Sequence, residues 1–496
     1  MNQIDQCYGG YSALLQTAPA SDVRAHRGPT QKWRRGAVAV LCALSVSSAG
    51  VAPAWAQSLI RDTETDALLS RYARPILQAA NLTSVRMRVV CQEDFNAFVF
   101  DGRNVFVSTG LLKEARTPNE VIGVIAHEIG HISGGHIMQL RNQVERMQAM
   151  SLLFGILGIA AMAASVASGG DTAREMGGLG TGIMLGGQNA AVMSFLAERR
   201  AQESAADQAA MGFLEATKQS GRGMLETFER FAGAEYVSET HRSPFQRTHP
   251  VAVQRLAQLR ERVARSPHAG AVDKPELQAE HDLVKAKVTG YLYPLQHVLG
   301  VYPTSNQSLP ARYARAIARN CSGRCSTKPG SSLELECSAT AIHELDALVR
   351  EQPRNPYFLE AKGFALFQAT RFKEALEPLR KAVELTGGRS PLIQAQLARA
   401  LVRGGGDRAQ IDEAISLLGS VIRAENENAE AYRLRGEAHS KRGDEGRAYL
   451  DTADYHYYIG NSERAAYFAK LAQTKLPKGT PEWQRAQDVI SLKPSK

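Results

Sequence analysis

The sequence lacks the patterns that mark several classes of protein. Its 496 residues contain no Lys/Arg block and no alternation of basic and aromatic residues, so nothing in them favours nucleic-acid binding. The basic excess is mild, with 59 Lys and Arg against 50 Asp and Glu, and a weak attraction to anionic surfaces is not diagnostic. The composition is globular, 44% hydrophobic and 22% charged, and the length suffices for two or three domains.

Cysteine is scarce. Beyond residue 56 only four cysteines remain, namely Cys91, Cys321, Cys325 and Cys337. An even count in an exported protein favours disulfides, and three pairings are possible. A second zinc site built from the last three is a weaker alternative, because no further ligand completes the spacing nearby.

We predict that residues 1–56 are a cleaved secretory signal. Arg34 and Arg35 form the positive end, residues 36–45 the apolar run, and residues 54–56, Ala-Trp-Ala, fit a small-x-small cleavage site. The expected location is therefore the periplasm, with peripheral membrane contact left open.

The most informative motif is His-Glu-Ile-Gly-His at residues 127–131. Two imidazoles four residues apart on one helix can reach the same metal ion, and Glu128 between them can take a proton from a water molecule. This is the H-E-x-x-H pattern of zinc peptidases. Thr117 and Pro118 precede an apolar run, as expected for a capped helix start.

The third metal ligand must lie elsewhere. Gly134 suits an H-E-x-x-H-x-x-G-x-x-H pattern, but position 137, where the third histidine should be, is Ile137. On a continuing helix His136 would point about 140° away from His131, so we reject it as a ligand.

A carboxylate pair lies further along the chain. Residues 195–213 read as a helix, on which Glu203 and Asp207 share one face. Glu203 would complete a His-His-Glu zinc site with one position open. Asp207 would accept a hydrogen bond from the nitrogen of a zinc histidine that does not bind the metal.

These motifs carry a family resemblance. The pairing of residues 127–131 with residues 203–207, H-E-x-x-H…E-x-x-x-D, resembles the gluzincin family of the CAAX prenyl protease and the heat-shock protease HtpX. Residues 104–112 resemble the strand segment that precedes the metal helix in that family. Residues 248–250, Thr-His-Pro, with Arg255, resemble its downstream T-H-P…R motif. The resemblance covers roughly residues 60–259.

The resemblance implies a zinc endopeptidase with one Zn²⁺ per chain. His127, His131 and Glu203 would hold the ion, and Glu128 would be the catalytic base. His249 would lie near the ion, where it would either donate a hydrogen bond to the reaction intermediate or occupy the open metal position. The segment around Asn104–Ser108 would be an edge strand that pairs with an extended substrate.

The predicted fold class is mainly α: a zincin-like metallopeptidase domain with a small β-sheet, followed by an α-solenoid of tetratricopeptide-type repeats. We expect the peptidase domain at residues 57–265, a connector at 266–345 and the repeats at 346–496. Gly363 and Gly436 recur about two periods of a ~34-residue repeat apart. A half-repeat is expected from Gly460.

One long apolar stretch lies inside the peptidase domain, at Met150–Ala167. It is long enough to span a bilayer, but small residues interrupt it. We interpret it, with the glycine-rich segment 169–189, as a helical excursion between the two zinc helices.

Together these features predict a periplasmic zinc metalloendopeptidase. The resemblance implies that it degrades misfolded or stalled outer-membrane proteins, while the repeats act as a chaperone and contact the β-barrel assembly machinery. Two alternatives remain: an assembly chaperone or scaffold whose metal site is latent or structural, and a membrane-embedded prenyl-protein protease, which a single apolar stretch disfavours.

Overall fold

The computed structural model describes residues 59–491, except residues 169, 233–248, 250–252 and 321–331. The predicted secretory signal lies outside the described residues. The chain divides into two compact units, one formed by residues 1–61 and 72–272, the other by residues 62–71 and 273–496. Helix α3, Thr63–Ala79, contributes its first turns to the second unit and its remainder to the first.

A four-stranded sheet in the order β1-β2-β4-β3 forms one layer of the first unit. Its strands are β1 (Leu59–Ile60), β2 (Arg86–Val90), β3 (Ala97–Val99) and β4 (Asn104–Ser108). The pair β2 and β4 is parallel, whereas β4 and β3 are antiparallel. Strand β4 is thus paired on both sides, and the expectation that it is an edge strand is wrong. The edge beside it is β3.

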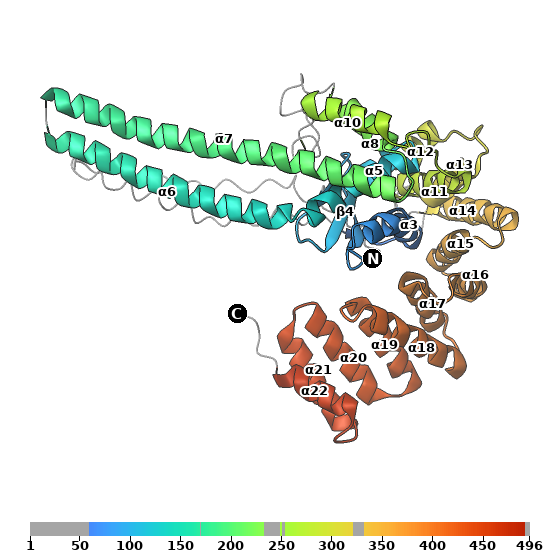
Figure 1. Ribbon diagram of the computed structural model, residues 1–496. Coiled ribbons are helices and arrows are strands. Elements are labelled where there is room, and N and C mark those ends of the chain that lie inside the picture. Colours follow the sequence, from blue (N-terminus) through green and yellow to red (C-terminus); the bar gives the residue numbers. More distant parts are fainter. Residues whose placement is uncertain (1–58, 169, 233–248, 250–252, 321–331, 492–496) are drawn as a thin grey trace, which may run out of the picture. The chain divides into compact units, whose positions relative to one another are not determined.

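The helices of the first unit follow the sheet. They are α4 (Thr109–Glu114), α5 (Pro118–Ser133), α6 (His136–Ser168), α7 (Gly170–Ala216), α8 (Arg222–Ala232) and α10 (Val253–Arg265). Helices α6 and α7 form a long antiparallel hairpin, which extends to the left in Figure 1. The predicted excursion is helical and corresponds to α6 and the first part of α7, but it is continuous with the second motif helix, because α7 runs on through Glu203. Among the described residues, no helix is long and apolar enough to cross a membrane.

Helix α5 starts as the sequence predicts. The Thr117 side chain accepts a hydrogen bond from the Glu120 amide, and Pro118 occupies the first turn, where its missing N–H costs nothing. The helix is buried almost throughout, and α7 and α8 pack against it. A Cβ atom added at Gly130 would lie 2.7 Å from the carbonyl oxygen of Ala206, so only glycine allows α7 to approach α5 this closely.

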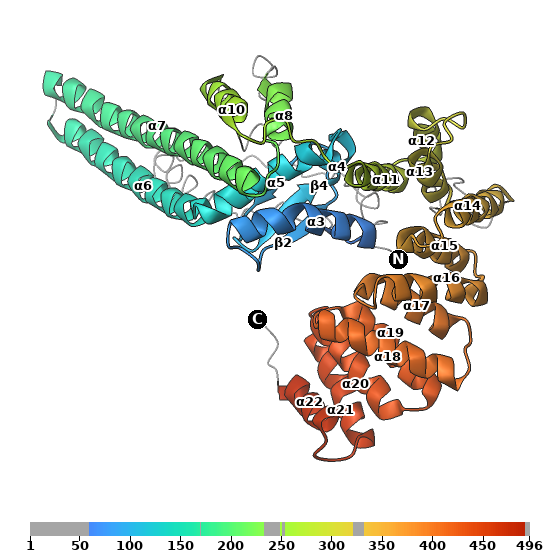
Figure 2. The same ribbon diagram turned by 45° about the vertical axis from the view of Figure 1, so that its right-hand side comes forward.

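The second unit is helical. Figure 2 shows its later helices as a succession of pairs. The helices are α11 (Pro275–Leu292), α12 (Leu295–Val301), α13 (Leu309–Asn320), α14 (Ser332–Glu351), α15 (Pro356–Gln368), α16 (Phe372–Leu385), α17 (Pro391–Arg403), α18 (Arg408–Ala424), α19 (Ala429–Arg442), α20 (Glu445–Tyr458), α21 (Ser462–Lys475) and α22 (Pro481–Ser491). The predicted fold class, a peptidase domain with a small sheet followed by helical repeats, is confirmed.

Small residues lie where paired helices cross, as expected. A Cβ atom at Gly363 of α15 would lie 2.4 Å from Cγ of Leu379 in α16. Two details differ from the expectation. The segment after Gly460 forms a complete pair, α21 and α22, because Ala465, Ala469 and Val489 build a core between them. The expected connector is itself mostly helical in its described part.

Cys91 and Cys337 each take part in a disulfide, in line with the disulfides that the even cysteine count favours. Cys321 and Cys325 lie outside the described residues.

Candidate metal centre and peptidase site

Helices α5 and α7 bring the predicted ligands together. His127 Nε2 lies 3.1 Å from His131 Nε2. Glu203 of α7 places Oε2 3.4 Å from His127 Nε2 and Oε1 3.5 Å from His131 Nε2. All three side chains are buried. The close approach at Gly130 is what carries Glu203 to this position.

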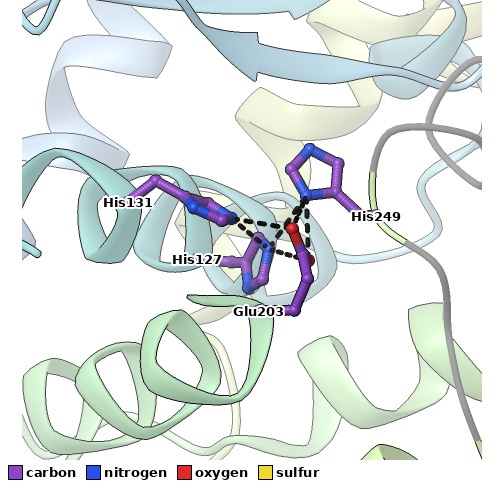
Figure 3. A group of neighbouring side chains, drawn as sticks. All are labelled: His127, His131, Glu203 and His249. Carbon is purple, nitrogen blue, oxygen red and sulfur yellow. Dashed lines mark hydrogen bonds and ion pairs between the residues drawn. The ribbon is translucent and has the colours of Figure 1, made fainter. Parts of the chain in front are cut away.

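His249 joins the cluster from beyond α8. Its Nδ1 lies 3.1 Å from Glu203 Oε2 and 3.3 Å from His127 Nε2. Figure 3 shows its ring against the Glu203 carboxylate, on the side opposite the α7 backbone. The four residues offer ligand atoms that all lie within 4.8 Å of one another.

These separations fit a metal ion. Four atoms that bind one ion tetrahedrally at about 2.0–2.1 Å are separated from one another by about 3.3 Å. The contacts of His127 with His131, Glu203 and His249, and those of Glu203 with His131 and His249, run from 3.1 to 3.5 Å, and all four ligand atoms lie within 4.8 Å of one another. His249 Nδ1 lies beside the His-His-Glu set, within 4.8 Å of its ligand atoms.

The outward-facing nitrogen of each motif histidine also has a neighbour. Asp207 Oδ1 lies 2.9 Å from His127 Nδ1, where sequence reasoning put it. His136 Nδ1 lies 3.0 Å from His131 Nδ1. Such neighbours fix the ring orientation of a metal-binding histidine.

The position of His136 overturns a premise of the sequence analysis. Helix α5 ends at Ser133, and Gly135 has a φ of +64°, so the helix does not continue to His136. The turn brings the His136 ring back to His131. His136 nonetheless stands outside the group of possible ligands.

Arg255 of α10 connects the two carboxylates of α7. Its Nε and Nη2 donate to Asp207 at 2.8 and 2.9 Å, and its Nη1 donates to Glu203 Oε2 at 3.1 Å. The guanidinium is buried, with Phe228 beneath it at 5.3 Å from the ring centroid. The sequence places Arg255 in a motif, but its contacts with Asp207 and Glu203 were not predicted from it. The signal available for them was the spacing of Arg255 from His249.

Glu128 differs from the other acids of the site. Its side chain is completely buried, and neither carboxylate oxygen has a hydrogen-bond partner among the described residues. His249 Nε2 lies 3.4 Å from Glu128 Oε1 without hydrogen-bond geometry. Burial raises the pKa of Glu128. A buried acid without a partner needs an external group, such as water.

The electrostatics favour a positive charge in the cluster. Burial alone would lower the pKa of His127, but the carboxylates of Asp207 and Glu203 outweigh it and raise the pKa to about 9. Burial would raise the pKa of Glu203, but His249 and His127 hold it well below its ordinary value. The negative charge of Asp207 and Glu203 therefore favours a cation at this position.

Comparison with known proteins identifies the domain. Residues 61–263 match peptidase family M48. The chain contains an M48 peptidase domain. It is similar to a "Beta-barrel assembly-enhancing protease" of Yersinia pestis, with 24% identity over 68% of this chain and 66% of that protein. A protein of the same name from Escherichia coli K12 is 24% identical over 78% of each chain.

A shorter relative matches the peptidase part. "Metalloprotease LoiP" of Escherichia coli K12 is 28% identical over 39% of this chain and 72% of that protein. The M48 domain is therefore that of a metalloendopeptidase, and its family implies a metal at the cluster that α5 and α7 build.

Proposed function

We propose that this M48 protein is a periplasmic zinc metalloendopeptidase that cleaves misfolded or stalled outer-membrane proteins. One observation carries the peptidase part: a metal-sized cluster of His127, His131 and Glu203 lies next to Glu128, a buried carboxylate without a hydrogen-bond partner among the described residues. The name shared by the longer relatives supports the substrate class.

Zinc is the ion that this donor set suits, because a His-His-Glu set with one open position is a zinc-peptidase arrangement. The bound ion would polarise the scissile carbonyl and acidify water. Glu128 accepts the proton of the attacking water and delivers it to the leaving amine. Asp207, held by Arg255, keeps the His127 ring in its binding orientation.

The substrate backbone would pair with β3 rather than β4, because β3 is the sheet edge beside α5. Backbone pairing at an edge strand gives affinity without a strict sequence preference. Phe98 and Phe106 stack at 5.1 Å across β3 and β4, and Phe100, half exposed, stacks on Phe106 at 5.0 Å. These rings would contact substrate side chains next to that edge.

His249 supports a latent resting state over a role as oxyanion donor. It takes the corner of the cluster that catalysis needs open, at 3.1 Å from Glu203 and 3.3 Å from His127. Activity would then require His249 to leave this corner. The same contact also supports a second candidate function, that of an assembly chaperone whose metal site is inactive.

The predicted export signal at residues 1–56 and the disulfide-bonded Cys91 and Cys337 support a periplasmic location. The helical repeats would bind unfolded outer-membrane proteins and the β-barrel assembly machinery, since stacked helix pairs offer extended binding surfaces.

The test uses the purified full chain and an unfolded outer-membrane β-barrel protein. We expect one zinc per chain, cleavage that a chelator abolishes and zinc restores, and slower cleavage of the same protein once folded. Chelator-resistant cleavage would contradict the metal site. Zinc binding without cleavage of any unfolded protein, even by a His249→Ala variant, would favour the chaperone alternative.

A further inference from the structure

The second unit contains a pocket of about 570 Å³ between the first turns of α3, helix α11 and the turn that joins α14 to α15. The three helices α11, α14 and α15 are yellow to brown in Figure 1. All residues that line the pocket belong to this unit. Its volume falls within the range of ligand-binding sites. It shares no residue with the peptidase site.

The floor of the pocket is apolar. Leu68 of α3 and Leu283 and Val284 of α11 line it and are buried. The half-buried Tyr357 ring adds an aromatic wall, and Lys287 Nζ lies 6.0 Å from its centroid. This floor suits a large apolar side chain.

The acidic groups of the lining are already neutralised within the protein. Glu280 forms an ion pair with Arg71. Glu64 accepts a hydrogen bond from the Tyr313 hydroxyl at 2.9 Å and lies 3.3 Å from Lys287 Nζ. The pocket therefore offers no unpaired anion to a ligand.

The turn from α14 to α15 contains hydrogen-bond donors that have no partner among the described residues. Arg354 is exposed and has neither an ion pair nor a hydrogen bond among the residues that the structure describes. Gln352 Oε1 accepts from Asn355 Nδ2 at 3.1 Å, which leaves the Gln352 amide NH₂ as a donor. Asn355 Oδ1 caps α15 and is fully used. A guanidinium and an amide donor beside an apolar floor suit a carboxylate attached to an apolar group.

We propose that this pocket binds the C-terminal residue of a polypeptide, with its apolar side chain on the Leu68–Leu283 floor and its free carboxylate at Arg354 and Gln352. Capture of a terminal carboxylate together with an adjacent side chain is a known mode of peptide recognition. The proposal goes beyond the function proposed above and does not depend on the metal.

The test measures binding of two labelled peptides that share one sequence ending in phenylalanine, one with a free carboxylate and one amidated, by fluorescence polarisation on the full chain. We expect the free acid to bind about tenfold more tightly than the amide, and Arg354→Gln to remove that difference. Arg350→Gln is the matched control, because Arg350 is exposed on α14 but does not line the pocket.

A second variant, Ala67→Phe, fills the pocket from α3 and should abolish binding of both peptides. Its thermal unfolding and peptidase activity should match the unsubstituted chain, which separates loss of the pocket from loss of fold or of the metal site. Equal binding of acid and amide would overturn the proposal. The proposal would also be overturned if Arg354→Gln bound both peptides as the unsubstituted chain does. Binding of a fatty acid but of neither peptide would overturn it as well.

Discussion

Among the described residues, one cluster of buried ionisable groups in the peptidase unit can be compared with one in the second unit, and the two are completed in different ways. In the second unit, Lys287 Nζ lies 2.6 Å from Asp62, 3.3 Å from Glu64 and 3.9 Å from Glu360. Each of the three carboxylates also accepts at least one hydrogen bond, from the hydroxyls of Thr65, Tyr313 and Thr63 respectively. This cluster contains its own cation.

In the cluster of the peptidase unit, some buried polar atoms lack a hydrogen-bond partner among the described residues. Arg255 neutralises Asp207 and contacts one oxygen of Glu203, yet both oxygens of Glu128 lack a hydrogen-bond partner among the described residues. Three histidines converge on Glu203 at metal-binding distances. In the Lys287 cluster every carboxylate accepts at least one hydrogen bond, although Glu360 Oε2 accepts none among the described residues, whereas in the peptidase unit Glu128 accepts none at either oxygen. A catalytic cluster leaves such places for a metal, water and substrate.

Substitution of Glu128 should have the largest effect in the peptidase cluster. Glu128→Gln keeps the size of the side chain but removes the proton acceptor, so cleavage of an unfolded outer-membrane protein should fall by about 10²–10⁴-fold while zinc content is unchanged. Glu145→Gln, at an exposed position on α6, is the control and should cleave normally. Cleavage at the full rate by the Glu128 variant would reject it as the base.

Lys287→Met tests the opposite cluster. The variant leaves three buried carboxylates without their cation, which should lower the free energy of unfolding by about 3–5 kcal/mol. Urea denaturation measures this loss, and Lys274→Met, at an exposed position before α11, should leave the midpoint unchanged. Equal stability of the two variants would mean that Lys287 does not hold this cluster together.

Glu360 gives the second cluster a pH dependence. Burial raises the pKa of Glu360 from 4.5 to about 7 despite the nearby Lys287. The folded state therefore binds a proton more tightly than the unfolded state. Its contribution is most favourable below pH 4.5 and is lost as the pH rises through 7, by about 3 kcal/mol at most. Glu360→Gln should flatten this part of the stability curve measured by urea denaturation. A slope equal to that of the unsubstituted chain would assign the dependence to another group.

The sequence predicts the parts of the site that local periodicity determines. A four-residue spacing on a helix puts His127 and His131 on one face, and the same rule pairs Glu203 with Asp207. Thr117 and Pro118 mark the helix start correctly, because capping depends on neighbouring residues only.

The remaining features depend on contacts between distant segments. The strand order that makes β3 the edge follows from the pairing of β4 with both β2 and β3, which no single segment encodes. His136 returns to His131 because of a left-handed glycine at 135, a conformation that a continuing helix pattern hides. The position of His249 depends on a segment that has no periodic pattern before α10, so its two roles could not be separated in advance.

His249 contacts both His127 and Glu203, so it can complete the peptidase cluster from within the protein, as Lys287 completes the other cluster. If its imidazole closes the fourth corner at rest, His249→Ala opens that corner to water, and cleavage should rise about tenfold with zinc retained. Initial rates measured at equal zinc content decide the matter. His268→Ala, a substitution outside the cluster, should change nothing. An inactive His249→Ala variant that still holds zinc would instead make His249 a hydrogen-bond donor to the reaction intermediate. The resting structure would then be the active form of the site, not a form that His249 blocks.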